Sequence, residues 1–142
     1  MVSAVKKDFN ENKNLYFRLN NFIEKNTKTL HIADDYGQLD MLLSLQQASR
    51  SVFSFIKNEE KKSVASNNYL VNRRKINYIS DVSSLQNDFD ILLISTPNFD
   101  WKNINFIPKK IIIIKNIDIK IPENFEKISG ENGIKVYFNN LP

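Results

Sequence analysis

The stretch TLHIADDYGQLD, which spans Thr29 to Asp40, decides the fold class of this chain. Its apolar first half predicts a strand, and the polar residues that follow predict a tight turn and the start of a helix. This layout is typical of the ligand-binding edge of nucleotide-type α/β proteins, where glycines let the backbone approach a ligand. Ala33 and Asp35 stand at two positions where glycine is usual, and only Gly37 remains. The stretch therefore predicts the fold and argues against its usual ligand chemistry.

Length and composition place the chain among ordinary globular proteins. Its 142 residues predict a single domain over 1–142, and 42% hydrophobic with 25% charged residues is usual for such a domain. No apolar run reaches the roughly 20 residues that a membrane-spanning helix needs. The absence of cysteine excludes a disulfide framework and a thiolate zinc site. We therefore expect a cytoplasmic protein that does not enter a membrane.

The net charge of +4 leaves a nucleic-acid partner open as an alternative. Arg73 and Arg74 fall where a helix is expected to end, and cations are favoured there by the helix dipole. The other basic clusters are short, and acidic and apolar residues interrupt them. Basic residues on ordinary solvent-exposed faces explain this pattern better than an organised nucleic-acid-binding patch does. A nucleic-acid-positioning module built on Arg73, Arg74 and Lys75 remains a second alternative.

Strands alternate with helices along the chain. Three segments carry apolar residues at helical spacing, and five short, largely apolar runs are typical of strands. The fourth and fifth runs are nearly continuous in isoleucine and leucine, which suits parallel strands covered on both faces. This order predicts an α/β sandwich with a mostly parallel sheet and a C-terminal antiparallel hairpin. The expected elements are helices at 14–25, 37–48 and 58–72, strands at 29–33, 51–56, 75–80, 90–95 and 109–115, and a hairpin of 125–129 with 133–138.

Two families share this element order, and spacing separates them. A phosphoacceptor receiver domain needs an acidic pair, a further Asp, a Ser or Thr, and a Lys at successive strand ends. Residues 82–89 alone separate the third and fourth expected strands, too few for the dozen or more residues of a helical crossover. The spacing argues against a receiver domain, although the chain has the required residue types at Asp34-Asp35, Asp81, Ser95 or Thr96, and Lys115.

The chain resembles class I S-adenosylmethionine (SAM) methyltransferases from about Leu15 to Lys115. In that family a glycine-rich loop follows the first strand, and an acid ends the second. A helix with an Ala-x-x-Asn-like stretch comes next. The third strand then ends in Asp, and a Phe-Asp or Tyr-Asp pair opens the fourth. The matching segments here are 30–45, 51–70 with ASNN at 65–68, INYISDV at 76–82 and FDILLI at 89–94. The resemblance implies a Rossmann-like methyltransferase sandwich.

The resemblance also implies a SAM site, and the chain departs from the family's pattern there. Ala33 and Asp35 replace glycines. The acid that accepts hydrogen bonds from the ribose is replaced by Ile56-Lys57, whose side chains offer no acceptor. Asp81, which in the family reaches the adenine amino group, is retained. If SAM binds, the resemblance implies that these residues of the chain contact it: Asp34, Asp35, Gly37, Lys57, Asp81 and Val82. We expect no cofactor and no catalytic residue.

Ser95–Phe99, with the sequence STPNF, follows the fourth expected strand. Amino-group methyltransferases often have an Asn/Asp-Pro-Pro-aromatic turn there, which holds the target nitrogen. This chain has one proline and no leading amide or acid, so we interpret STPNF as a connecting turn. The links at 96–108 and 116–124 are also short for helical crossovers. These losses resemble the non-catalytic N-terminal half of some ribosomal RNA guanine-N2 methyltransferases, and methyltransferase-like regions of larger bacterial multidomain proteins.

Three further groups each have a structural and a functional interpretation. His31, the only histidine, is expected to be a core or interface residue, because no second histidine or acid cluster gives it a catalytic partner. No spacing of histidines and acids predicts a metal site. Asp34-Asp35 suits a helix N-terminus better than a cation or ribose site. Phe99 and Trp101 are either lid-like or partner-contacting aromatics, or anchors of a short loop.

These observations predict a degenerate, non-catalytic methyltransferase-like domain that binds or scaffolds a protein partner or a neighbouring domain. An active SAM-dependent methyltransferase with an altered cofactor loop is the alternative.

Overall fold

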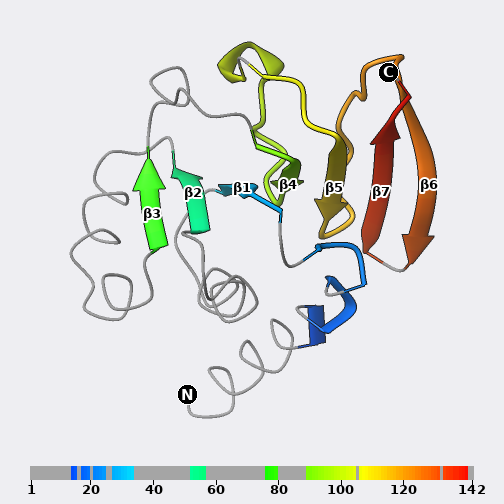
Figure 1. The fold of residues 1–142 in the computed structure, drawn as a ribbon, viewed down its shortest axis with the longest axis horizontal. Helices are drawn as coiled ribbons and strands as arrows, with labels where there is room; N and C mark the ends of the chain where they lie inside the picture. Colours follow the sequence, from blue (N-terminus) through cyan, green and yellow to red (C-terminus); the bar gives the residue numbers. More distant parts are fainter. Residues whose placement is uncertain are drawn as a thin grey trace.

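The computed structural model describes residues 14–15, 17–19, 21–24, 27–33, 52–56, 76–79, 89–104, 106–131 and 133–140. Seven strands form one sheet in the order β3-β2-β1-β4-β5-β7-β6 (Figure 1). Their bounds differ from the predicted ones by two residues at most. The strands are β1 (Thr29–Ala33), β2 (Val52–Ile56), β3 (Ile76–Ile79), β4 (Ile91–Ile94), β5 (Lys110–Ile114), β6 (Phe125–Glu131) and β7 (Ile134–Asn139).

The pairings make most of the sheet parallel. β1 lies between β2 and β4, and all neighbouring pairs from β3 across to β5 are parallel. β7 is antiparallel to both β5 and β6. The C-terminal hairpin therefore adds two strands, of which β6 runs in the same direction as β1–β5. β6 forms an edge of the sheet, with β7 inserted between it and β5.

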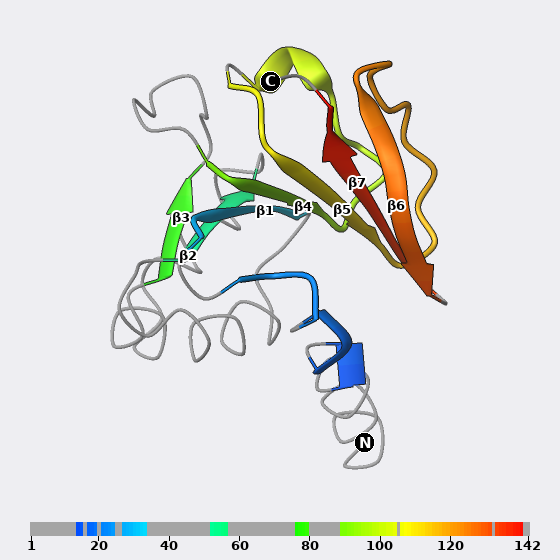
Figure 2. The ribbon, with the colours of Figure 1, turned by 45° about the vertical axis from the view of Figure 1, so that its right-hand side comes forward.

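Both faces of the central strands are buried, because successive side chains of a strand point to opposite faces. We name the two groups of buried side chains by what covers them. The helix-side cluster consists of Leu15, Leu19, Ile23, Ile91, Leu93, Ile112, Ile114, Ile134 and Val136. The loop-side cluster consists of Leu30, Ile32, Phe89, Leu92, Ile94, Ile111 and Ile113. Figure 2 shows the blue N-terminal segment on one side of the sheet and the yellow-green loop after β4 on the other.

The N-terminal segment, residues 14–24, supplies three side chains to the helix-side cluster. Residues 14–15 and 17–19 are helical, and a turn follows at 21–22. The prediction that the helix continues to residue 25 is wrong. The backbone N–H groups of Phe22 and Ile23 both donate to the Leu19 carbonyl, at 2.9 and 3.1 Å. The bond from Phe22 spans only three residues, so the last turn is tighter than an α-helical turn, which is a common way for a helix to end.

The predicted helices at 37–48 and 58–72 lie outside the described residues. The link from β4 to β5 has a single short 3-10 helix, η2 (Trp101–Asn103), among its described residues. Its first turn is capped by the Asp100 carboxylate, which accepts from the Lys102 N–H at 3.0 Å. The link from β5 to β6 has no helix. The predicted shortening of the crossovers is therefore confirmed for these two links.

Within the described part of the chain, no helix is long and apolar enough to span a membrane.

Candidate functional site

The strand order places a topological switch point between β1 and β4. The chain proceeds from β1 through β2 to β3, then returns to the other side of β1 with β4 and β5. In open α/β sheets, ligands bind in the crevice outside the carboxyl ends of the strands at such a point. The candidate site is therefore the edge where β1 ends at Ala33 and β4 ends at Ile94 (Figure 1).

The cofactor residues that the resemblance implies follow three neighbouring strands. Asp34, Asp35 and Gly37 come after β1, Lys57 after β2, and Asp81 and Val82 after β3; all six lie outside the described residues. The strands before them are in register, with Ala33 beside Ile56 and Phe55 beside Ile79. Ala33, which stands at a usual glycine position, is buried at the end of β1.

Ser95 joins the ends of β1 and β4 to each other. Its N–H donates to the Ile32 carbonyl at 3.0 Å, and its hydroxyl lies 3.1 Å from the same oxygen. The hydroxyl oxygen is also 2.7 Å from Nε2 of His31. A hydroxyl has one hydrogen, so a Ser95 that donates to Ile32 accepts from the His31 N–H. In this arrangement His31 does not activate Ser95 as a nucleophile.

His31 is a core residue, as predicted. It is buried in β1, and its parallel partner in β4 is Leu93 of the helix-side cluster. The hydrogen bond with Ser95 gives the buried imidazole a polar partner across the switch point. Among the described residues, no group of three or more histidines and acids is placed to hold a metal ion.

The STPNF turn contains a hydrogen bond of its own. Thr96 is buried, and its hydroxyl accepts from the Asn98 N–H at 3.1 Å. Phe99 and Trp101 pack edge-to-face, with ring centroids 4.8 Å apart, and both contact the loop-side cluster. Trp101 Nε1 also donates to the Lys120 carbonyl at 2.7 Å. These contacts support the interpretation of the two aromatic residues as anchors of a short loop.

Removing the Ser95 hydroxyl tests how much this bridge stabilises the fold. Ser95→Ala removes the hydrogen bond between the buried imidazole and Ser95, so we expect the free energy of unfolding to fall by about 1–3 kcal/mol. Urea denaturation measures the loss. Ser95→Thr keeps the hydroxyl and should retain most of the stability. Equal stability of wild type and Ser95→Ala would show that the bridge contributes nothing.

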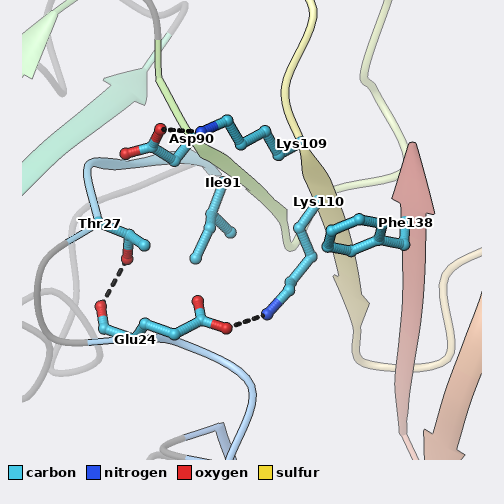
Figure 3. Close-up of a pocket in the computed structure, with 7 residues that line it drawn as sticks. All are labelled: Glu24, Thr27, Asp90, Ile91, Lys109, Lys110 and Phe138. Atoms are coloured by element: carbon cyan, nitrogen blue, oxygen red, sulfur yellow. Dashed lines mark hydrogen bonds and ion pairs between the residues drawn. The ribbon is translucent and has the colours of Figure 1, made fainter. Parts of the chain in front are cut away.

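A pocket lies at the opposite, amino-terminal edge of the sheet, between the N-terminal segment and the starts of β4 and β5 (Figure 3). Ion pairs line it. Lys110 Nζ donates to Glu24 Oε1 and to the Phe22 carbonyl, each at 2.7 Å, and Lys109 Nζ lies 3.9 Å from Asp90 Oδ1. The charged groups of the pocket therefore face one another. Its lining consists of Glu24, Thr27, Asp90, Ile91, Lys109, Lys110 and Phe138.

The pair of Lys110 and Glu24 attaches the N-terminal segment to β5. The Lys110 side chain is buried and its ammonium covers the Phe22 carbonyl, which follows the end of the helix. Burial by itself would raise the pKa of Glu24. The hydrogen bond from Lys110, a bond to its own backbone N–H and the Lys110 charge outweigh burial and the weaker effect of Asp90, so the pKa is lowered. No sequence pattern predicts this pair; its one local sign is a lysine at the start of an isoleucine run.

The lowered pKa predicts that this pair loses its effect in acid. A carboxyl group whose folded pKa is depressed stabilises the fold above its unfolded value of about 4.3, and the effect disappears as pH falls through the folded pKa. Since Glu24 is largely exposed, we expect Glu24→Gln to cost less than about 1 kcal/mol at neutral pH and nothing in acid. Urea denaturation at both pH values measures this difference. In a Lys110→Met background the neutral-pH cost should vanish; an equal cost there would contradict the pairing.

Comparisons with known proteins identify the fold. No protein-family model matches the chain, and no curated protein matches its sequence. Among solved structures, the crystal structure of the "putative methylase HI0767 from Haemophilus influenzae" is similar. The two share 16% sequence identity with a TM-score of 0.55, over 89% of this chain and 94% of that chain. The chain therefore has a methyltransferase-like α/β fold.

Proposed function

We propose that this chain is a non-catalytic methyltransferase-like domain that binds a protein partner or a neighbouring domain, and that it has lost the SAM site. It would then be a degenerate member of the fold, as its resemblance to the non-catalytic halves of ribosomal RNA guanine-N2 methyltransferases implies. The support comes from the contacts at the ends of β1 and β4 and from the residues that follow β1, β2 and β4.

The observation that carries the proposal is the bridge between β1 and β4. The Ile32 carbonyl and the His31 imidazole, at the end of β1, both bond to Ser95. Polar groups that are already paired with each other lose those bonds when they turn to a ligand, which makes ligand binding at the switch point less favourable.

The residues that follow the strands support the same proposal. Asp35 brings a carboxylate to a place where the family has glycine, and a Cβ limits how closely the backbone can approach a ligand. After β2, Ile56-Lys57 offers no acceptor for ribose hydroxyls. After β4, the Thr96 hydroxyl accepts from the backbone of its own turn, where amino-group methyltransferases hold the target nitrogen.

A calorimetric titration of SAM and S-adenosylhomocysteine into the folded chain tests the proposal. We expect no heat of binding even at millimolar ligand, with circular dichroism confirming that the protein is folded. Micromolar binding would overturn the proposal and favour an active methyltransferase with an altered loop. Under that alternative, Asp35→Ala should abolish binding, whereas Glu123→Ala, a change at an exposed acid in the link before β6, should leave it intact.

A further inference from the structure

The link between β5 and β6 has no helix and does not join the sheet. After β5, Lys115 and Asn116 adopt positive φ angles of 63° and 54°, which reverses the direction of the chain. Residues 117–121 then lead toward the start of β6, and their isoleucines pack against the loop-side cluster. A helix is the usual element for a link between strands that run in the same direction. Here a segment without regular secondary structure takes its place.

Side chains alternate along this segment, IDIKI at 117–121. Its three isoleucines are half-buried and pack against the loop-side cluster. Asp118 and Lys120 lie between them and are exposed. The segment therefore has the alternation of a strand with one buried face.

The backbone of the segment is not paired with another strand. Within the described part of the chain, no backbone–backbone hydrogen bond involves residues 117–121. Trp101 Nε1 donates to the Lys120 carbonyl, so the edge that carries the Lys120 groups faces Trp101. Successive residues of an extended chain direct their backbone groups to opposite edges. The N–H and C=O groups of Ile117, Ile119 and Ile121 therefore share the edge that points away from Trp101.

The charges of the segment are complementary to a second copy of itself. An antiparallel pairing about a two-fold axis at Ile119 sets Asp118 opposite the partner's Lys120, and Lys120 opposite the partner's Asp118. If the axis lies at Asp118, that residue faces the partner's Asp118; if it lies at Lys120, that residue faces the partner's Lys120. Like charges directly opposite each other are destabilising. Charge thus selects the register centred on Ile119.

We propose that residues 117–121 are a self-association site, where a second copy of the chain adds the same segment as an antiparallel strand. Ile119 pairs with the partner's Ile119, and Ile117 pairs with the partner's Ile121. These pairs exchange backbone hydrogen bonds on the edge that points away from Trp101. Asp118 and Lys120 then occupy the pairs without hydrogen bonds, where side chains lie closest. The site uses none of the candidate cofactor residues and does not depend on the proposed loss of SAM binding.

Amide hydrogen exchange at rising protein concentration tests the pairing residue by residue. Because the paired segment is short, we expect a weak dimer, so the experiment runs up to millimolar protein. The amides of Ile117, Ile119 and Ile121 should become protected as the dimer forms, whereas those of Asp118 and Lys120 should not change. A chain that stays monomeric by sedimentation at millimolar concentration would overturn the proposal, as would protection without this alternation.

Reversing the charge of Lys120 tests the pairing independently, and a second charge reversal at Asp118 should restore it. Lys120→Glu places a carboxylate opposite the partner's Asp118 twice in each dimer, and we expect the dimer Kd to rise about tenfold. Adding Asp118→Lys restores both opposite-charge pairs and should return the Kd to near the wild-type value. Lys102→Glu, the same charge change in η2, is the control and should leave the Kd unchanged. Equal dimerisation by wild type and Lys120→Glu would show that another surface is used.

Discussion

Phe89→Ala is expected to lower the free energy of unfolding by about 3–5 kcal/mol, the largest effect among the substitutions considered. The Phe89 side chain is 2% exposed and is the largest fully buried side chain among the described residues. Its ring lies 5.3 Å from that of Phe106, and Lys28 Nζ is 4.9 Å from its centroid. Truncation removes these contacts and leaves a cavity just before β4, between the sheet and the loop that covers it.

Urea denaturation measures this loss, with Phe138→Ala as the matched control. Phe138 is 42% exposed on β7, so we expect its truncation to cost about 1 kcal/mol or less. Similar losses for the two variants would contradict the assignment of Phe89 to the core. A large loss for Phe89→Ala alone would confirm that the loop after β4 packs on the sheet through this side chain.

Leu19→Ala should cost about 2–5 kcal/mol. Leu19 is fully buried and joins the N-terminal segment to β4, β5 and β7 through the helix-side cluster. Its truncation leaves a cavity between the helix and the sheet, which only partial relaxation can fill. The same urea experiment measures the loss, and a single cooperative transition would show that the helix unfolds together with the sheet.

Phe17→Ala is the control on the same helix. Phe17 is 56% exposed, so its truncation should cost about 1 kcal/mol or less, although more atoms are removed than in Leu19→Ala. If Leu19→Ala were as stable as wild type, the N-terminal segment would contribute nothing to the core.

The strands could be predicted because their signals are local. β4 and β5 are nearly continuous runs of isoleucine and leucine, and such runs suit strands with both faces covered. A core or interface position of His31 also followed from its lack of a catalytic partner. The end of the N-terminal helix was predicted too late, because the tightened last turn at Leu19 has no clear sequence signal.

The location of the candidate site could be predicted from the sequence, but its hydrogen bonds could not. The strand–turn–helix pattern at Thr29–Asp40 indicates the carboxyl edge of β1. Nothing in that stretch indicates that Ser95, 64 residues after His31, bonds to it across the switch point. The attachment of Glu24 to Lys110, 86 residues away, was missed for the same reason.

By itself, the sequence determined the α/β class and the strands, and it has Ala33 and Asp35 where the family that it resembles has glycines. Periodicity and residue type act over a few neighbouring residues, so they can be read from the chain alone. The tertiary structure alone decided that β7 is inserted between β5 and β6, that Ser95 bridges the two halves of the sheet, and that residues 117–121 pack on the loop-side cluster without joining the sheet. These features depend on which distant segments meet, and packing of the whole chain selects those contacts.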